Sequence, residues 1–343
     1  MINLKDLTYE QLTDFIKDLG ESKFRAQQIF SWLHKGVSTI DEMSNLSLKL
    51  REKLKEKCFV SCPKTELKLV SKLDGTVKYL FGLEDGNCIE TVVMKYNHGL
   101  SICISTQVGC AMGCGFCAST IDGKVRNLTA GEILDQVIFA QKDMGERISN
   151  IVLMGIGEPL DNYENVLVFL DNVTHKSGLN IGWRHISLST CGIVPKIISL
   201  ADMQTQLNLC ISLHAADDET RSKIMPINKK YPIGELIDAA KYYINKTGRR
   251  ITFEYSLIAG VNDSDEHAKK LARLLSSMLC HVNLIPVNHV EERNYKKSNY
   301  ASEFRAKLES MGINATVRRE LGSDISASCG QLRRKHSKNS DES

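Results

Sequence analysis

Apolar and polar residues alternate with different periods in two parts of the chain, and the change falls near residue 90. In the first part, apolar residues recur every three or four positions, which predicts short amphipathic helices at residues 9–19, 23–35 and 46–58. Two strand-like stretches, residues 65–71 and 76–82, follow, and Asp74-Gly75 between them is typical of a hairpin turn. We therefore expect residues 1–90 to form a small, mainly helical accessory domain that ends in a β-hairpin.

From about residue 100 onward, short apolar runs alternate with amphipathic segments of helical period. The runs predict strands at residues 100–106, 150–154, 185–189, 207–213, 250–257, 281–287 and 314–318. The segments between them predict helices at residues 130–142, 163–173, 232–246, 265–278 and 302–311. Repeated βα units imply an α/β fold with a parallel sheet, either an open or complete βα barrel or a doubly wound sheet. In a barrel, the active site lies at the C-terminal ends of the strands.

Composition narrows the class of protein. Of the 343 residues, 42% are hydrophobic and 25% are charged, which is ordinary for a globular protein and argues against a disordered chain. No apolar run approaches the roughly 20 residues that cross a bilayer, and the N-terminus has no apolar secretory segment. We therefore expect a cytoplasmic protein without membrane contact, in which thiols stay reduced. The formal net charge of +3 neither requires nor excludes a nucleic-acid partner.

Three of the eleven cysteines lie together in Gly-Cys-Ala-Met-Gly-Cys-Gly-Phe-Cys, residues 109–117. Cys110, Cys114 and Cys117 follow the first expected barrel strand, and the small glycines between them let the loop close tightly around a metal centre. A zinc site normally needs four ligands, and a ferredoxin-type [4Fe–4S] cluster needs a fourth cysteine at a defined spacing. Three cysteines on four irons would leave one iron open to a ligand from outside the protein. An incomplete zinc knuckle is the alternative interpretation.

This Cx3CxxC motif, with Phe116 before its last cysteine, resembles the signature of radical S-adenosylmethionine (SAM) enzymes. The resemblance implies that Cys110, Cys114 and Cys117 bind one [4Fe–4S] cluster per chain. Its open iron then binds SAM and reduces it to a 5′-deoxyadenosyl radical. The resemblance also implies a partial βα barrel of the radical SAM type and an electron donor such as flavodoxin or ferredoxin.

Further stretches are similar to blocks of the RlmN-type RNA methyltransferases and together cover nearly the whole chain. They lie at residues 24–33, 90–94, 154–162, 212–214, 225–228, 282–288 and 329–332. The resemblance implies methylation at carbon 2 of adenosine in 23S ribosomal RNA, at adenosine 2503 of the peptidyl transferase centre, and in tRNA at adenosine 37. Relatives that methylate adenine carbon 8 share the cluster but typically carry Arg-Tyr in place of Pro286-Val287, so this pair favours carbon 2.

Carbon 2 of adenine is electrophilic and carries no acidic proton. Ordinary attack on the methyl group of SAM cannot methylate it, whereas a carbon radical can add there. The family uses two SAM molecules and two cysteines outside the cluster, and Cys329 and Cys103 occupy the matching positions. The resemblance implies that Cys329 carries an S-methyl group and then a covalent link to the RNA, and that Cys103 resolves this adduct through a transient disulfide. Glu90 matches the acceptor of the carbon 2 proton.

The same resemblance implies a set of SAM contacts, most of which fall at or after expected strand ends, the ligand-binding rim of a barrel. These residues are Gly157, Glu158, Ser189, Ser212, Leu213, His214 and Asn288. Cys329 follows a small, polar stretch at residues 322–328, which predicts a loop near the barrel mouth. The remaining cysteines are expected to be small structural residues: Cys58, Cys62, Cys88, Cys191, Cys210 and Cys280.

We expect a monomer with an accessory domain at 1–90, a barrel with a catalytic C-terminal loop at 91–332 and a polar tail at 333–343. Phosphate contacts with 23S rRNA or tRNA could come from basic side chains: Lys49, Arg51, Lys53, Lys55, Lys57, Arg318, Arg319, Arg333, Arg334 and Lys335. One alternative is a carbon 8 methyltransferase. Another, from a different class, is a non-catalytic metal-containing RNA-binding protein, which leaves Cys103, Cys329 and Glu90 without a task.

Overall fold

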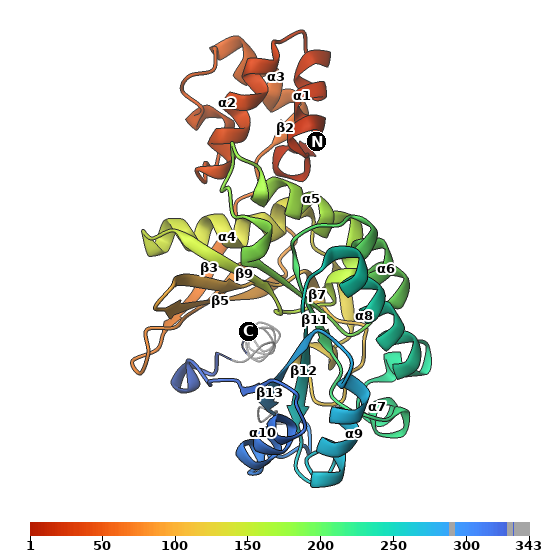
Figure 1. The fold of residues 1–343 in the computed structure, drawn as a ribbon. Helices are drawn as coiled ribbons and strands as arrows, with labels where there is room; N and C mark the ends of the chain where they lie inside the picture. Colours follow the sequence, from red (N-terminus) through yellow and green to blue (C-terminus); the bar gives the residue numbers. More distant parts are fainter. Residues whose placement is uncertain (288–291, 328–331, 333–343) are drawn as a thin grey trace.

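The computed structural model describes residues 1–287, 292–327 and 332, and these residues form a smaller N-terminal core and a larger main core. Figure 1 shows the N-terminal part, in red, as a lobe beyond the helices of the main body. Its elements are β1 (Ile2–Asn3), α1 (Tyr9–Asp18), α2 (Lys23–His34), α3 (Leu48–Lys57) and β2 (Cys58–Phe59), with 3-10 turns at Leu4–Asp6 and Ile40–Glu42. The three predicted helices are confirmed.

Polar residues set the starts of these helices. Thr8 accepts a hydrogen bond from the backbone N–H of Gln11, and the Gln11 side chain accepts one from the Thr8 N–H, which forms a capping box before α1. Ser47 Oγ accepts from the Leu50 N–H and caps α3. The helix therefore begins two residues later than the apolar period predicts, because the cap and not the buried face sets its boundary.

The main body is built on a sheet that runs, within the described residues, in the order β14–β13–β12–β11–β10–β9–β6–β5–β4–β3. Pairing is parallel from β6 to β14 and antiparallel from β3 to β6. The strands are β3 (Lys64–Val70), β4 (Val77–Gly82), β5 (Cys88–Tyr96), β6 (Gly99–Cys103), β9 (Ile148–Leu153), β10 (Ile186–Thr190), β11 (Asn208–Ser212), β12 (Ile251–Leu257), β13 (Cys280–Pro286) and β14 (Ala315–Val317).

The strand order decides between the two folds that periodicity allowed. The parallel strands cross the sheet in chain order, whereas a doubly wound sheet reverses its order at a switch point. Strands β3 and β14 end the sheet and, within the described residues, do not pair with each other, so the barrel is open. The expectation of an α/β partial barrel with a helical N-terminal region is confirmed, and the doubly wound sheet is excluded.

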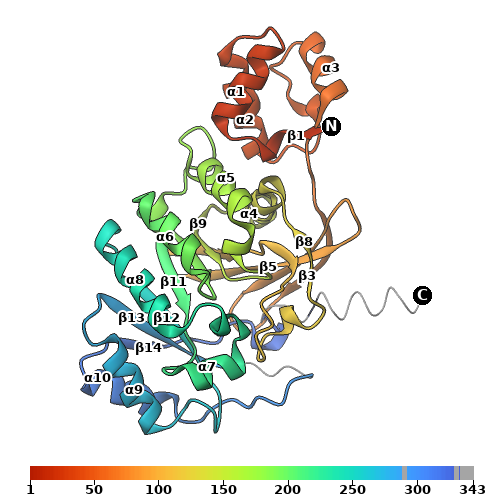
Figure 2. The ribbon, with the colours of Figure 1, turned by 90° about the vertical axis from the view of Figure 1, so that its right-hand side faces the viewer.

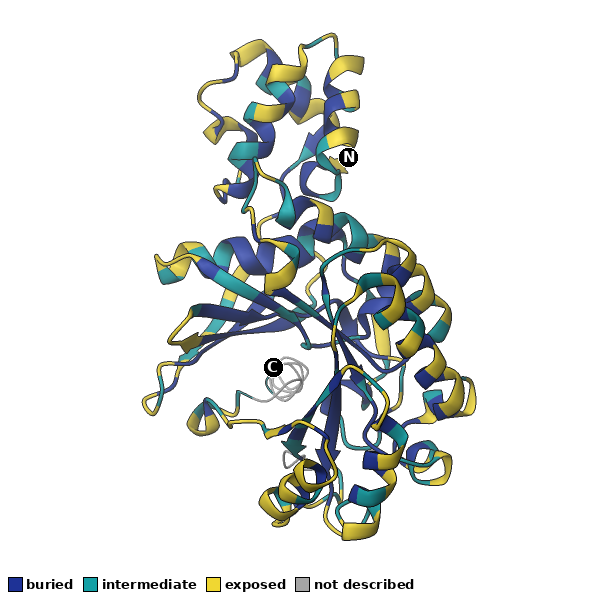
Figure 3. Ribbon diagram, viewed as in Figure 1, coloured by how far each residue is buried: buried dark blue, intermediate teal, exposed yellow. Residues whose placement is uncertain are grey.

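Helices follow the parallel strands and lie along the outer side of the curved sheet, as Figures 1 and 2 show. They are α4 (Ala130–Met144), α5 (Tyr163–Thr174), α6 (Val194–Asp202), α7 (Asp218–Ile224), α8 (Ile233–Thr247), α9 (Asp265–Leu275) and α10 (Ala301–Ser310). The strands are largely buried and the outer faces of the helices are exposed (Figure 3). No helix in the described part of the chain is long and apolar enough to cross a membrane.

Some helices and strands were not among the predicted ones. These are the helices α6 and α7, the strands β1, β2 and β5, and the antiparallel pair β7 (Gln107–Gly109) and β8 (Lys124–Asn127). All except β5 are too short for their period to be recognised in the sequence.

The hairpin that was expected to close the accessory domain belongs to the main sheet. Strands β3 and β4 pair with each other, and β4 pairs with β5 over six residue positions. The N-terminal core, by contrast, ends at Val60. We therefore propose a domain boundary near residue 60 rather than at residue 90.

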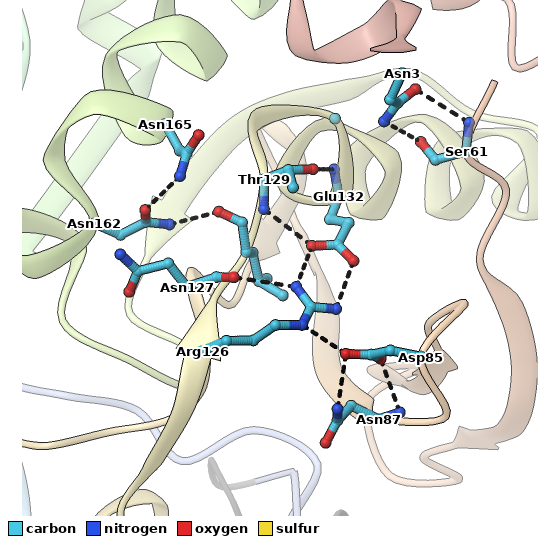
Figure 4. A network of polar contacts seen from close by, with 12 residues as sticks. Asn3, Ser61, Asp85, Asn87, Arg126, Asn127, Thr129, Glu132, Asn162 and Asn165 are labelled. Carbon is cyan, nitrogen blue, oxygen red and sulfur yellow. Dashed lines mark hydrogen bonds and ion pairs between the residues drawn. The ribbon is translucent and has the colours of Figure 1, made fainter. Parts of the chain in front are cut away.

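Buried polar contacts with α4 fasten the N-terminal lobe to the main body. Lys5 is 1% exposed, forms an ion pair with Asp135 of α4 and donates a hydrogen bond to the Ser61 carbonyl at 2.8 Å. Asp135 also accepts from Ser61 Oγ, and Asn3 Nδ2 donates to the same hydroxyl at 3.1 Å (Figure 4). Burial raises the pKa of Asp135, while the Lys5 charge opposes that rise. Each of these two buried charges is therefore stabilised by the other.

Arg126 fixes the end of the loop that carries the three motif cysteines. Its guanidinium donates to both oxygens of Glu132 in the first turn of α4, at 2.7 and 2.8 Å, and to Asp85 in the β4–β5 turn at 2.6 Å (Figure 4). A bidentate pair restricts both distance and orientation. The C-terminal end of the cysteine loop is therefore held against α4 and the β4–β5 turn.

Removing one member of the Lys5–Asp135 pair leaves the other buried and charged. We expect Asp135→Ala to lower the free energy of unfolding by about 3–5 kcal/mol. The double variant Lys5→Met with Asp135→Leu removes both charges and should be clearly less destabilised. Urea titration followed by the fluorescence of Trp32, in the N-terminal lobe, measures the difference. Equal destabilisation by the single and double variants would contradict charge burial as the cause.

Candidate active site

A cavity of about 250 Å³ opens at the C-terminal ends of the parallel strands. Residues at or just after the ends of β9, β10 and β11 line it, together with residues of β12, β13 and the loop that follows β7. This is the rim at which a βα barrel binds its ligands. The cavity therefore lies where the sequence predicts the active site.

The loop between β7 and β8 brings Cys110, Cys114 and Cys117 to one wall of this cavity. The Cys110 N–H donates to the Gly123 carbonyl at 2.9 Å and closes the base of the loop. Gly109 has a φ of +77°, and a Cβ there would lie 2.0 Å from the Gly123 carbonyl oxygen. Glycine is therefore required at this position for the loop to close.

The three motif thiols line one cavity, where they could hold a metal centre. Within residues 1–287, 292–327 and 332, no three His, Cys, Asp or Glu side chains converge closely enough to hold one metal ion. A zinc ion draws its ligands to about 2.0–2.3 Å, whereas a four-iron cluster takes each thiolate at a different corner. Three thiols on one wall of the cavity are the ligands that the cysteine motif predicts for a [4Fe–4S] cluster.

Burial favours the neutral form of these thiols. It raises the pKa of Cys110 to about 12 and raises the pKa of Cys114 well above its usual range, and charge on the neighbouring thiols adds to both shifts. The thiolate is the form that binds metal. A positively charged metal centre is therefore what would ionise them in this cavity.

Five of the seven expected SAM contacts line the cavity with the cysteines: Gly157, Glu158, Ser189, Ser212 and His214. Gly157 has a φ of +106°, and a Cβ there would lie 2.6 Å from Gln107 Cβ, so the backbone approach needs glycine. Leu213 does not line the cavity, because its side chain is fully buried in the main core and its N–H donates to the Glu254 carbonyl at 3.0 Å. Asn288 lies outside the described residues.

The carboxylate of Glu158 braces the rim. It accepts hydrogen bonds from the Leu160 N–H at 3.0 Å and from the Cys191 N–H at 2.7 Å, which ties the chain after β9 to the end of β10. Burial raises the pKa of Glu158, and these hydrogen bonds oppose the rise. Each carboxylate oxygen accepts one backbone hydrogen bond and keeps further acceptor capacity, so a ligand here can meet the Glu158 carboxylate as well as the backbone of Gly157 and Glu158.

His214 is held as a neutral hydrogen-bond donor. Its Nδ1 accepts from the Ser256 N–H at 2.9 Å, and its φ of +56° is unusual for a residue with a side chain. Burial lowers its pKa to about 3, and the charge of Arg221 adds to the shift. A neutral ring whose Nδ1 accepts carries its proton on Nε2. The ring packs edge-on against Phe116, with 4.8 Å between centroids, and so lies beside the cysteine loop.

Arg221 of α7 is a structural residue of the site that sequence reasoning missed. It is fully buried and donates to the carbonyls of Cys191 at 2.7 Å and of Ser212 and Leu213 at 3.0 Å, and to Asn228 Oδ1 at 3.0 Å. Burial lowers its pKa to about 10, so it remains charged. In the sequence it stands among other charged residues, and only its tertiary contacts distinguish it.

Glu90 and Cys103 face the same side of the sheet on neighbouring strands. Val92 of β5 pairs directly with Cys103 of β6, and Glu90 lies two residues before Val92. This register places the backbones of Glu90 and Cys103 roughly 7–8 Å apart. Cys103 and Ala327, two residues before Cys329, line a second pocket. The structure therefore brings Glu90 and Cys103 together, while Cys329 itself lies outside the described residues.

Three of the cysteines expected to be structural depart from that expectation. Cys62 is exposed, in the segment between β2 and β3, and Cys88 is partly exposed at the start of β5. The pattern of hydrophobic residues around Cys62 and Cys88 does not indicate that the chain is at the surface at these two positions. Cys191 is buried as expected but lines the cavity beside the motif cysteines. Cys58, Cys210 and Cys280 are buried as predicted.

The basic residues of α3 are largely engaged within the N-terminal lobe. Arg51 donates to the Asp41 carbonyl at 2.8 Å, Lys53 to the Leu19 carbonyl at 3.3 Å, and Lys55 to the Asp41 carboxylate at 3.1 Å. Near the C-terminus, Arg318 lines the main cavity and Arg319 the second pocket. The remaining candidates, Arg333, Arg334 and Lys335, lie outside the described residues.

Comparison with known families agrees with this geometry. A family model for the ribosomal RNA large subunit methyltransferase N-terminal domain matches residues 2–60, and the radical SAM superfamily model matches residues 104–272. The probable dual-specificity RNA methyltransferase RlmN of Alkaliphilus oremlandii is 60% identical over 98% of this chain and 99% of its own length. Its counterpart in Clostridioides difficile is 58% identical over 98% of both chains.

A crystal structure of a radical SAM methyltransferase from Sphaerobacter thermophilus has the same fold. It superposes with a TM-score of 0.91 at 43% identity, over 96% of this chain and 99% of that one. The resemblance expected from the cysteine motif and the sequence blocks is confirmed. The chain belongs to the RlmN family of RNA methyltransferases within the radical SAM superfamily.

Proposed function

We propose that this protein methylates carbon 2 of adenosine in 23S ribosomal RNA, at adenosine 2503, and in tRNA, at adenosine 37. The observation that carries the proposal is the pairing of β5 with β6, which sets Glu90 beside Cys103 on one face of the sheet. The segment that leads to Cys329 lines the same pocket as Cys103. A base and a thiol on one face of the sheet, beside the segment that precedes Cys329, suit radical addition followed by resolution of a covalent adduct.

In this proposal, residues of the main cavity bind the cofactors and residues at the second pocket act on the RNA base. Cys110, Cys114 and Cys117 would hold the cluster, and Gly157, Glu158, Ser189, Ser212, His214 and Asn288 would hold SAM beside it. When bound, the cluster and SAM supply the carbon radical that removes a hydrogen atom from the S-methyl group of Cys329. An electron donor such as flavodoxin or ferredoxin feeds this chemistry.

Cys329 then links its methylene carbon to carbon 2 of the base. The adduct returns one electron to the redox chemistry that supplied it, and Glu90 accepts the proton that leaves carbon 2. The Cys103 thiolate attacks the Cys329 sulfur, and the electron pair of the breaking carbon–sulfur bond stays on the methylene carbon, which takes up a proton such as the one lost by the Cys103 thiol. The RNA therefore keeps a methyl group and the protein keeps a disulfide. We propose that the protein acts as a monomer and in the cytoplasm, where these RNAs are found.

The Pro286-Val287 pair supports carbon 2 over carbon 8. Val287 is buried at the edge of the main cavity, and Pro286 lines the second pocket, so both positions lie beside the reacting groups. Larger polar side chains at these positions would alter how the base is held. The non-catalytic alternative has no use for a buried carboxylate and a buried thiol on the same sheet face.

The position of the methyl group tests the proposal directly. RNA that has been incubated with the reduced enzyme and SAM is digested to nucleosides and compared with standards of 2-methyladenosine and 8-methyladenosine. We expect 2-methyladenosine. The carbon 8 product would overturn the assigned specificity, and bound RNA without SAM consumption would support the non-catalytic alternative.

The motif cysteines should be required for iron, whereas the fourth cysteine in the cavity should not. We expect about four irons per chain in anaerobic protein, and loss of both iron and SAM cleavage in Cys110→Ala, Cys114→Ala and Cys117→Ala. Cys191→Ala is the matched control and should keep its iron. Iron analysis and quantification of 5′-deoxyadenosine check these outcomes. Stoichiometric zinc in place of iron would contradict the cluster.

The two remaining catalytic cysteines should fail at different steps. Cys329→Ala cannot form the S-methyl group, so the RNA should stay unmodified and separable from the protein. Cys103→Ala can add to the base but has no thiol to break the carbon–sulfur bond, so a covalent protein–RNA species should accumulate. A denaturing gel with labelled RNA distinguishes the two variants. Identical behaviour, with neither variant trapping RNA, is incompatible with the assigned roles.

A further inference from the structure

Residues 321–327, which we call the strap, are fastened to the β3–β4 hairpin far away in the sequence. The Gly322 N–H donates to Asp74 Oδ2 at 2.8 Å, and Ser71 Oγ donates to Asp324 at 2.7 Å. The hydrogen bond from Gly322 helps to lower the pKa of Asp74 to about 2, so this carboxylate stays ionised. The strap is therefore docked on the hairpin and leads from there toward Cys329.

Lys78 of β4 joins the docked strap to Glu90. Its side chain is fully buried, and its Nζ lies 2.7 Å from Glu90 Oε2 and donates to the Ser326 carbonyl at 2.9 Å. Lys78 pairs with Val92, two residues after Glu90, so the two side chains share one face of the sheet. A single cation thus contacts both the proposed proton acceptor and the strap, three residues before Cys329.

Stability alone does not explain a buried ion pair at this place. Two buried charges lose their hydration, and apolar residues of similar size are often as stable or more stable. Removing only the lysine, however, would take the ion-pair partner Lys78 away from a carboxylate that is 3% exposed. An adjacent cation stabilises the charged form of a carboxylate, which is the form that can accept a proton.

We propose that Lys78 is a positioning residue for the methylation chemistry, which keeps Glu90 ionised in place and holds the strap that precedes Cys329 against it. The inference rests on the proposed function, in which Glu90 accepts the carbon 2 proton. In that step the proton moves to a Glu90 oxygen, and the electron pair of the broken C–H bond stays in the RNA–protein adduct. Glu90 becomes neutral, and Lys78 keeps its charge throughout.

Three substitutions of Lys78 separate its charge from its contact with the strap. Lys78→Met removes both, Lys78→Gln removes the charge but keeps a donor for the Ser326 carbonyl, and Lys78→Arg keeps the charge. Lys68→Met is the control, because Lys68 of the neighbouring strand pairs with Asp143 and not with Glu90.

Adduct formation precedes proton removal, so loss of the charge should block resolution and trap RNA. We expect Lys78→Met and Lys78→Gln to lose about 100-fold or more in turnover, the range of a general base, and to accumulate covalent protein–RNA on a denaturing gel. Mass spectrometry should still find S-methyl Cys329 in both. Lys78→Arg should retain most of the turnover, and Lys68→Met should match the wild type within twofold.

Amide hydrogen exchange provides a readout apart from activity. Peptides that cover the strap should exchange faster in Lys78→Met than in the wild type, while Lys78→Gln and Lys78→Arg should stay close to the wild type. Turnover of either neutral variant within twofold of the wild type would overturn the proposal. So would loss of turnover without trapped RNA in a variant that still methylates Cys329.

Two comparisons keep the test decisive. If Lys78→Met fails to fold, Lys78→Gln alone decides by the same criteria, since it keeps a polar group in the buried site. If the wild type does not methylate RNA and Cys103→Ala never traps it, the proposed function itself fails. Wild-type methylation with trapping by Cys103→Ala, but not by the neutral Lys78 variants, overturns only the role of Lys78.

Discussion

Parallel strands that end at one rim leave backbone N–H and C=O groups around a partly dry cavity, and each group needs a partner. Two buried side chains supply many of these hydrogen bonds. Arg221 donates to the carbonyls of Cys191, Ser212 and Leu213, and the Glu158 carboxylate accepts from N–H groups that follow β9 and β10. Since these bonds are made within the protein, the rim keeps its shape and leaves Gly157, Ser189 and the Nε2 of His214 to meet a ligand.

The candidate functional residues lie on both the parallel and the antiparallel part of the sheet. Its parallel part carries the cavity of the motif cysteines, and its antiparallel part carries Glu90 and Lys78. Strand β6 belongs to both, because it is parallel to β9 and antiparallel to β5, and Cys103 is its last residue. Cys103, the proposed resolving thiol, therefore lies between the strands that end at the cavity of the motif cysteines and the strand that carries Glu90.

Buried cations recur where separate elements of this molecule meet. Lys5 of the N-terminal lobe pairs with Asp135 of α4, Arg221 bonds to the carbonyls of neighbouring strand ends, and Lys78 contacts both Glu90 and the strap. Buried ion pairs contribute little net stability, but they are costly to leave half-made. They therefore suit contacts between elements that must adopt one arrangement. Arg221 and Lys78, which lie beside the candidate active site, hold the neighbouring groups in position.

The sequence by itself determined the period of most of the longer elements, the α/β class and the cysteine motif. The apolar spacing that buries the helices and strands is local, and the cysteine motif and the family resemblance singled out Glu90, Cys103 and several of the residues that line the cavity. The tertiary structure decided what depends on distant partners: that the barrel is open, that the hairpin joins the main sheet, and that Leu213 points into the core. It also showed that Arg221 and Lys78 are buried. A charged residue looks the same in a sequence whether it is solvated or enclosed, because the groups that neutralise it come from strands and loops far along the chain.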